Sequence, residues 1–455
     1  MDIIKKIKNF YKSPEEIPVT DSKDKIDRKY KKCRLDVFAS CFLGYTIFFH
    51  LTRKNYAVAM PSIVDDLHFT NVQLGFISSI MYFAFAAGKF VNGMIADRSD
   101  SKKLMPTALF MSSLANMLFA LSPVFLSPEI NLKACPILLI VMAFFWGVNG
   151  WFQSMGFPVV AKSLTYWWAK RERGTVWSIW TSSHQLGTCV AFIIAGFLVS
   201  KYGWQSAFII PALLNLFVCI GLYRHLYDKP AVVGLPEVEE YINGEPLQEE
   251  KDDIGLSYYE ILKKYVFSNK TLWLLALSFM FLNISRFGTE DWLIKYFHDT
   301  QGYQIIFASG ILVNLPLFGA IGTLFAGIFS DKVSKGRRLP ITFVFILGLI
   351  FSVYLIEYSH NGVIQLLGVC GAGFFAAGPC MFLSGICAVE TTSKKVAAAA
   401  TGFCGIFGYI GAMASGAGTG YFVDNFGWNS AINFWIVTIL AAFVILIPLI
   451  KQKDI

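Results

Sequence analysis

Long apolar segments alternate with short polar segments along almost the whole chain. A transmembrane helix needs about 20 apolar residues to cross roughly 30 Å of hydrocarbon. Segments of that length lie at residues 36–60, 72–96, 104–124, 136–160, 174–199, 205–223, 272–296, 304–329, 339–358, 362–388, 397–422 and 430–450. We therefore predict an all-α membrane protein with twelve transmembrane helices, embedded in a lipid bilayer.

Composition mainly excludes other classes of protein. Hydrophobic residues make up 55% of the chain and charged residues 15%, whereas soluble globular proteins have about 25% charged residues. No Walker loop, HExxH or GxSxG motif occurs, and the nine cysteines are scattered without a CxxC pair. We interpret these cysteines as small packing residues rather than metal ligands or disulfide partners. We expect no enzyme, no cofactor, no metal site and no nucleic-acid partner.

The basic residues of the short loops predict the orientation of the helices. With twelve spans, one side of the membrane receives Arg98, Lys102, Lys103, Lys170, Arg171, Arg173, Lys332, Lys335, Arg337, Arg338, Lys394 and Lys395. The opposite loops hold only Lys133 and Lys201. Because Lys and Arg accumulate in cytoplasmic loops, we predict that both termini are cytoplasmic. The Lys-rich start of the chain has no apolar core, so we expect no cleavable signal peptide.

Two sequence segments recur later in the chain, which indicates a duplicated architecture. Gly93–Arg98 recurs 234 residues later as Gly327–Lys332, and Tyr202–Ala207 recurs 224 residues later as Phe426–Ala431. The predicted parts are a basic N-terminal segment (1–35), a six-helix half (36–223), a cytoplasmic linker (224–270), a second six-helix half (271–450) and a short tail (451–455). Parallel six-helix repeats are typical of major facilitator transporters, whose binding site lies near the membrane midplane between the halves.

The repeated motif places an aspartate and a basic residue at equivalent cytoplasmic helix ends. These are Asp97 with Arg98 in the first half and Asp331 with Lys332 in the second. We predict that they form latches that open and close as the halves move. The alternative is that they are simply solvated loop residues.

Two arginines interrupt apolar segments at equivalent places in the two halves. Arg53 lies 40 residues before the first copy of the motif, and Arg286 lies 41 residues before the second. A guanidinium group inside a membrane costs about 3 kcal/mol and is rarely retained without a role. Snorkelling toward the nearer interface is the alternative, but it does not explain why both halves retain an arginine. Because guanidinium can donate two hydrogen bonds to a phosphate at once, we predict a central site for a doubly charged anion.

Other polar residues inside the apolar segments are weaker candidates. We expect Lys89 and His184 to face the same site, the alternatives being a paired structural lysine and a core histidine. His50, one turn before Arg53, is a weaker candidate still. Lys54 cannot point the same way as Arg53, because neighbours on a helix differ by about 100°.

We therefore expect Lys54 to act in gating. It would pair across the halves with Glu290 or Asp291, which lie in the same apolar segment as Arg286. Such a pair could form only while the two halves are close together at that level of the membrane.

The segment Thr52–Tyr56, followed by Ala59-Met60-Pro61, resembles the organophosphate:phosphate antiporter family of major facilitators. The resemblance runs from about residue 29 to residue 450. Further matching segments are Gly88-Lys89-Phe90, Ala96-Asp97-Arg98-Ser99, Trp151-Phe152-Gln153, Met155-Gly156, Arg173-Gly174, Gly234-Leu235-Pro236, Asp291-Trp292, Gly378-Pro379, Lys394-Lys395 and Ala399-Ala400-Thr401-Gly402-Phe403.

The resemblance implies that Arg53 and Arg286 bind a phosphoryl group with help from Lys89 and His184. It also implies that inorganic phosphate is the counter-substrate, and that the protein lies in a bacterial inner membrane. We expect a monomer. Departures from the family pattern at Asn283 and Ala377 favour a larger, hydroxylated ester, and hence a hexose phosphate.

Three alternatives remain open at this stage. The chain could exchange glycerol-3-phosphate for phosphate, or it could be a glucose-6-phosphate receptor that signals through a sensor kinase. It could also be a proton-coupled carrier of another solute, for which Glu290 and Asp291 are the best titratable candidates.

Overall fold

A computed structural model describes residues 6, 9–126, 135–243, 263–332, 334, 337–359, 361–392 and 397–450. In this part of the chain the structure is helical, and the only β interaction is an isolated bridge between Lys12 and Ser99. The first half contains α2 (Lys23–Ala39), η1 (Ser40–Phe48), α3 (Phe49–Leu51), α4 (Asn55–Leu67), α5 (Asn71–Asp97), α6 (Ser101–Leu126), α7 (Pro136–Gln153), α8 (Gly156–Trp167), α9 (Lys170–Tyr202) and α10 (Ser206–His225). The predicted linker contributes η2 (Pro230–Val233), α11 (Val238–Asn243) and η3 (Lys263–Phe267). The second half contains α13 (Lys270–Gln301), α14 (Ile305–Leu312), α15 (Asn314–Lys332), α16 (Leu339–Tyr358), α17 (Gly362–Met381), η4 (Phe382–Ile386), α18 (Cys387–Glu390), α19 (Ala397–Leu446) and η6 (Ile447–Leu449).

The predicted all-α class with twelve spans is confirmed once the longest helix is counted twice. Among the described residues, eleven helical stretches are long and apolar enough to cross a membrane. The last of them overlaps α19, which has 50 residues, so at 1.5 Å per residue its two arms together provide about 75 Å of helix, enough for two crossings. Its backbone leaves the helical region at Gly427, where φ is 79°, a value that glycine tolerates without strain. The last two predicted spans meet at this glycine.

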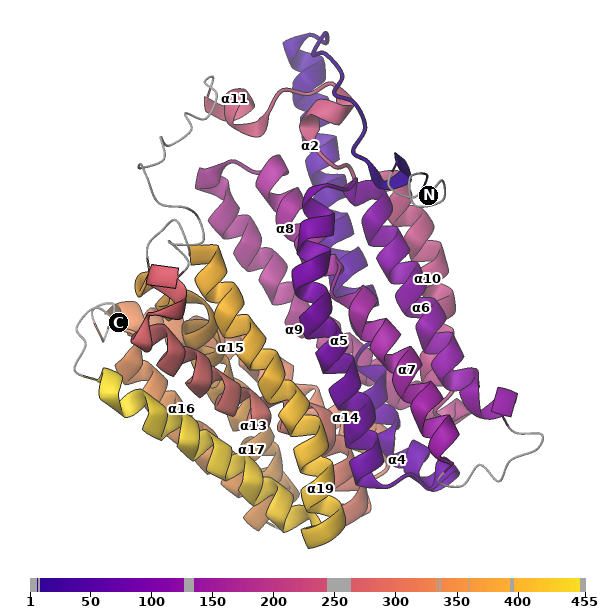
Figure 1. The fold of residues 1–455 in the computed structure, drawn as a ribbon, viewed down its shortest axis with the longest axis vertical. Coiled ribbons are helices and arrows are strands. Elements are labelled where there is room, and N and C mark those ends of the chain that lie inside the picture. The colour runs from indigo at the N-terminus through magenta and orange to yellow at the C-terminus, as the bar shows by residue number, and fades with distance from the viewer. Residues whose placement is uncertain are drawn as a thin grey trace.

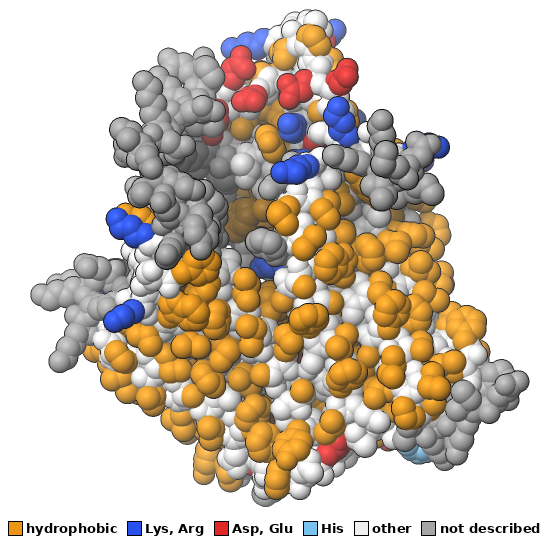
Figure 2. Space-filling model, viewed as in Figure 1, with side chains coloured by type: hydrophobic (Ala, Val, Ile, Leu, Met, Phe, Trp, Pro, Cys, Tyr) orange, Lys and Arg blue, Asp and Glu red, His pale blue; other side chains and the backbone are white. Residues whose placement is uncertain are grey.

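The outer surface of the molecule is apolar over most of its height. Figure 2 shows hydrophobic side chains across the broad middle of this face, whereas most of the visible charged side chains gather at the end with the N-terminal helices. Large hydrophobic residues such as Phe217, Val363 and Leu324 are more than two-thirds exposed. A soluble monomer rarely exposes so much apolar surface, so this band faces lipid.

The two halves meet toward one end of the molecule, which we call the closed end. Figure 1 shows the first half (indigo to magenta) and the second half (red to yellow) diverging toward the opposite end, which carries α2 and the C-terminus. The contacts between the halves join α5 to α19, α9 to α14, and α4 to α13. In Figure 2 the surface is hollowed between the halves below the N-terminal helices.

Close approach of α5 and α19 depends on glycine and serine. A Cβ atom at Gly75 would collide with the backbone of Gly416, so these helices touch backbone to backbone, as in small-residue membrane interfaces. The Ser79 hydroxyl donates to the carbonyl oxygen of Met413 at 2.8 Å and accepts from the N–H of Ala417 at 3.1 Å.

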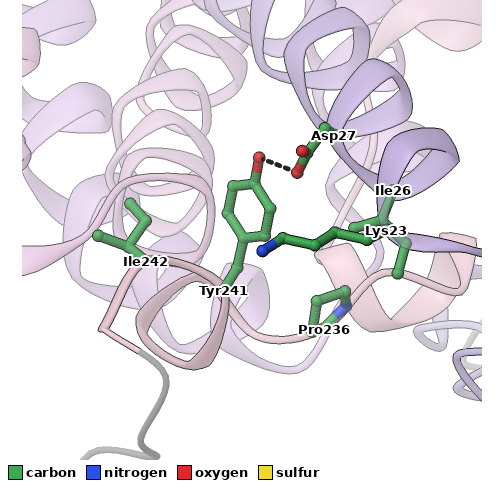
Figure 3. A pocket seen from close by; sticks show the side chains of 6 residues that line it. All are labelled: Lys23, Ile26, Asp27, Pro236, Tyr241 and Ile242. Carbon is green, nitrogen blue, oxygen red and sulfur yellow. Dashed lines mark hydrogen bonds between the residues drawn. The ribbon is translucent and has the colours of Figure 1, made fainter.

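The start of the predicted linker packs on the N-terminal helix. The ring of Tyr241 on α11 stacks on Tyr30 of α2 with centroids 4.1 Å apart, and its hydroxyl donates to Asp27 at 2.8 Å. Tyr30 donates to the carbonyl oxygen of Pro236 at 3.1 Å. Figure 3 shows an open pocket of about 420 Å³ beside this contact, lined by Lys23, Ile26, Asp27, Pro236, Tyr241 and Ile242. The lining residues come from α2 and the linker, and they include neither Arg53 nor Arg286. Residues 244–262 of the linker are outside the described part.

Candidate functional site

The first transmembrane helix breaks where the sequence changes from apolar to Thr52-Arg53-Lys54. Helix α3 ends at Leu51 and α4 begins at Asn55, so backbone carbonyl groups near the break need other hydrogen-bond donors. Side-chain amides from neighbouring helices supply them: Gln153 to the carbonyl of Phe49 (3.0 Å), Asn149 and Asn116 to that of Thr52 (2.9 and 3.0 Å), and Asn215 to that of Phe48 (3.3 Å).

The amides also bond to one another and to hydroxyl groups. Gln153 donates to Thr52 Oγ1 at 3.0 Å and to Ser112 Oγ at 2.9 Å, and Ser112 donates to Asn149 at 2.6 Å. All of these side chains are fully buried. This network was not predicted from the sequence, although asparagine and glutamine within apolar segments are its visible signal.

The break sends Arg53 and Lys54 in different directions. Arg53 Nη2 lies 2.6 Å from Nε2 of His50, and its guanidinium lies over the ring of Phe85, 5.8 Å from the centroid. Lys54 Nζ instead crosses to the second half, where it lies 3.1 Å from carboxylate oxygens of both Glu290 and Asp291. Lys54 therefore contacts both of the acids that the sequence offered as alternative partners.

This ion cluster is buried and includes a tyrosine that the sequence did not indicate. Lys54, Glu290 and Asp291 are each less than one-tenth exposed, and the hydroxyl of Tyr82 on α5 donates to Asp291. Lysine, two carboxylates and tyrosine thus join α5 and the first helix to α13 at the closed end. Such a desolvated cluster is strong only while all partners are present.

Arg286 on α13 lies on the other side of Glu290. Its Nη2 is 3.9 Å from Glu290, and its Nη1 makes a long hydrogen bond of 3.5 Å to Asn283. Its guanidinium lies over Phe287 at 5.2 Å, and the thiol of Cys380 lies beside it. The side chain remains 37% exposed, so much of the guanidinium is open to the space between the halves.

His184 on α9 lies near the cationic residues. The positive charges of Arg53, Arg286 and Lys89 all act on its ring. The ring packs edge-on against Trp180, with centroids 4.8 Å apart, and His184 is only partly buried. The structure therefore brings the four cationic or basic candidates into one region between the halves.

Lys89 on α5 faces aromatic rings rather than a carboxylate. Its Nζ lies 4.9 Å from the ring centroid of Phe157 and 5.5 Å from that of Tyr409 on α19. Among the described side chains no carboxylate lies within ion-pair distance of it. Tyr409 also packs against Phe85 at 4.9 Å, which makes it a further residue of the site that the sequence did not reveal.

The predicted latches lie at the end where the halves diverge. Arg98 and Lys332 are exposed there, while the side chains of Asp97 and Asp331 lie outside the described part. Their role remains a prediction.

Comparison with known proteins agrees with this architecture. Residues 42–416 match the family model of the Major Facilitator Superfamily. A probable hexose phosphate transport protein of Chlamydia pneumoniae is 35% identical over 96% of this chain and 95% of its own length. The membrane sensor protein UhpC of Escherichia coli is 31% identical over 98% of both chains. A glycerol-3-phosphate transporter of Bacillus subtilis is 32% identical over 96% of this chain and 97% of its own.

The fold is also similar to solved transporter structures. A bacterial homologue of the human lysosomal transporter Spinster, inward-facing and unoccupied, superposes with a TM-score of 0.67 at 16% identity, covering 92% of this chain and 95% of that chain. At this identity the likeness concerns the fold alone. The fold and the named relatives are those of transporters and a membrane sensor, which agrees with the prediction that the chain is not an enzyme.

Proposed function

Because the chain belongs to the organophosphate:phosphate antiporter family of the major facilitator superfamily, we propose that it exchanges a phosphate ester for inorganic phosphate by alternating access. The favoured ester is a hexose phosphate. The protein would act as a monomer in a bacterial inner membrane, with both termini cytoplasmic and the closed end facing outward.

The charge balance of the site is the observation that carries this proposal. The described side chains around it carry four cations and two carboxylates, a surplus of two positive charges. These groups are Arg53, Lys54, Lys89, Arg286, Glu290 and Asp291. A surplus of two matches a phosphate ester dianion, and two arginines from opposite halves suit phosphate because each guanidinium can donate a pair of hydrogen bonds.

The same surplus explains exchange rather than net flow. Closing the halves over Arg53 and Arg286 without an anion would bury two guanidinium groups that lack a full counter-charge, which is costly in a low-dielectric region. A bound anion removes much of that cost. The loaded carrier would therefore change conformation readily and the empty carrier slowly.

The preference for a hexose phosphate rests on side-chain size and on relatives. The side-chain oxygen of Asn283 lies 3.5 Å from Nη1 of Arg286, while its amide nitrogen donates to the carbonyl oxygen of Phe279. We propose that the small side chain of Ala377 leaves space for a sugar ring. The relative from Chlamydia pneumoniae is named as a probable hexose phosphate transport protein.

Conservative arginine variants test the anion site. We expect Arg53→Lys and Arg286→Lys each to lower the rate of exchange at least about tenfold, because lysine keeps the charge but loses the paired hydrogen bonds. Purified protein in phosphate-loaded liposomes would be offered labelled glucose-6-phosphate, glycerol-3-phosphate or phosphate. Arg224→Lys, an exposed arginine at the end of α10, is the matched control. Near-normal exchange in either site variant would rule out the anion site.

A receptor is the second candidate function, favoured by the similarity to the membrane sensor UhpC over nearly the whole length of both chains. The same liposomes separate the two functions. A carrier accumulates labelled ester, whereas a receptor binds the ester in equilibrium dialysis without appreciable flux. Preferential uptake of glycerol-3-phosphate over the hexose ester would show that the substrate is glycerol-3-phosphate rather than a hexose phosphate.

A further inference from the structure

His50 is a buried histidine that the proposed exchange does not require. It lies on α3, one turn before Arg53, and is 3% exposed. Its two ring nitrogens have different partners. Nδ1 lies 2.5 Å from the carbonyl oxygen of Thr46, and Nε2 lies 2.6 Å from Nη2 of Arg53.

These two partners determine which nitrogen carries the proton. A carbonyl oxygen can only accept a hydrogen bond, so Nδ1 must be the donor to Thr46. A guanidinium group can only donate, so Nε2 must present its lone pair to Arg53. Both contacts therefore require the same neutral tautomer, with the proton on Nδ1. A doubly protonated ring would lose the bond to Arg53 and place two cations in contact.

The ring is held in this orientation by its surroundings. Thr46 is fully buried, and its hydroxyl accepts a hydrogen bond from Ser183 of α9 at 2.7 Å. Gly187 on the same helix packs against both groups: a Cβ atom there would lie 2.7 Å from the Thr46 carbonyl oxygen and 3.3 Å from Cγ of His50. A side chain at this position would therefore collide with the carbonyl group that accepts the hydrogen bond from the ring.

Several charged and titratable groups act on the ring. Arg53 and Lys54 act from its own transmembrane segment, and His184 acts from α9 with its ring centroid 5.3 Å away. No carboxylate from the described elements contacts the ring directly. Because Arg53 and Lys54 are already cations, a second proton on the ring would place a further positive charge beside them, which agrees with the neutral tautomer.

We infer that His50 is a positioning residue that orients the guanidinium of Arg53 toward the anion. This inference rests on the proposed function of Arg53 in binding phosphate. Nε2 of His50 engages one edge of the guanidinium, while Arg53 Nε is buried without a partner among the described residues. The contact with His50 on one side and the ring of Phe85 on the other limit rotation of the guanidinium, which leaves its remaining N–H groups available to an anion. Pre-oriented donors bind more tightly, because less conformational freedom is lost on binding.

Two substitutions separate orientation from simple packing. His50→Met removes the acceptor at similar bulk, and we expect it to weaken binding of inorganic phosphate about tenfold. His50→Gln can present an amide oxygen near the position of Nε2, and we expect it to stay within about threefold of wild type. Binding would be measured by calorimetry on purified protein. His298→Met is the matched control, because His298 also contacts a backbone carbonyl oxygen, that of Tyr303, but lies outside the site.

The outcomes are distinguishable from failure of the proposed function. If wild type binds no phosphate, the proposed function fails. The positioning role is wrong if wild type binds phosphate and His50→Met binds it equally well. It is also wrong if His50→Gln loses as much phosphate affinity as His50→Met. Nitrogen-15 spectra of labelled histidine in the wild type test the tautomer without any ligand. We expect a neutral, Nδ1-protonated ring for His50, and an Nε2-protonated or charged ring would overturn the inference even if the variants fail to fold.

Discussion

At the scale of single residues, buried charges in this chain divide into paired and unpaired groups. Lys162 and Asp228 lie 2.7 Å apart with both side chains almost fully buried, so each charge compensates the other. Arg53 and Lys89 have no carboxylate within ion-pair distance among the described side chains. Because an uncompensated cation in a membrane interior is costly, its retention in the centre is better explained by a ligand than by stability.

The buried pair allows a prediction about acid stability. Burial acts to raise the pKa of the Asp228 carboxyl, but hydrogen bonds from Lys162 and Ser13 and the charge of Lys162 outweigh it, so the pKa is lowered. A lowered pKa stabilises the fold fully above the unfolded pKa, and this contribution is lost as the pH falls through the folded pKa. We therefore expect Asp228→Asn to lower the free energy of unfolding by about 1–3 kcal/mol at neutral pH.

The difference between wild type and variant should begin to shrink as the pH falls below about 4, where the carboxyl of the unfolded chain takes up a proton, and should vanish only below the lowered pKa of the folded state. Thermal unfolding in detergent across this range measures it. Asp65→Asn, at an exposed acid, should behave as wild type throughout. A penalty for Asp228→Asn that is independent of pH would show that shape rather than charge matters at this position.

At the scale of elements, the start of α5 is capped by the opposite half of the protein. Within its own half, Thr70 and Gln73 form a reciprocal capping box. Across the interface, Asp424 of α19 accepts hydrogen bonds from the N–H groups of Asn71 (3.0 Å) and Val72 (2.7 Å) and from the Asn71 side chain (2.7 Å). A carboxylate at a helix N-terminus is favoured by both hydrogen bonds and the helix dipole.

This cap can exist only while the closed end is closed. We therefore expect Asp424→Asn to shift the conformational equilibrium about fivefold to tenfold toward opening there, equivalent to about 1–1.4 kcal/mol. Distances between spin labels on the two halves at this end, measured by electron paramagnetic resonance, report the shift.

Thr70→Ala is the appropriate comparison, because it removes the local cap without touching the interface. It should weaken α5 but leave the label distances unchanged. Equal distance distributions for Asp424→Asn and wild type would mean that the cap does not bias the equilibrium.

At the scale of the whole molecule, the two halves pack together at one end, where a few polar contacts cross the interface, and diverge at the other. The Lys54 cluster lies between the anion site and the closed end, so it must break whenever that end opens. Such a cluster suits a moving interface, because its partners can be rehydrated separately once the halves part.

A double-mutant cycle tests whether Lys54 and Asp291 act as a pair. Lys54→Gln and Asp291→Asn should each slow exchange, because each unbalances the buried charges of the cluster. The double variant should lose less than the sum of the two effects, with a coupling of about 0.5–3 kcal/mol. Exchange rates in liposomes give all four values. Strictly additive losses would mean that the two residues do not meet during transport.

The sequence by itself determined the class, the number of spans and the duplication. Apolar segments of about 20 residues can be counted without a structure, because membrane thickness imposes their length. The structure adds to these spans: the first helix begins at Lys23, well before residue 36, and the last two spans are joined through Gly427. The sequence also singled out Arg53, Lys89, His184 and Arg286, because a charge in an apolar segment is conspicuous at any helix rotation.

Only the tertiary structure decided which partner each polar residue meets. Several of these contacts join residues from different helices: the carboxamides around the helix break, the two acids that contact Lys54, and the cap on α5. The contact of His50 with Arg53 depends on one side-chain rotamer. Asp424, for example, meets Asn71 across 353 positions of chain. Hydrophobic periodicity specifies which segments are buried in the membrane, but not how far each helix is rotated or shifted against its neighbours. Hydrogen bonds lose their strength within a few tenths of an ångström, and that precision arises only when all the helices are packed together.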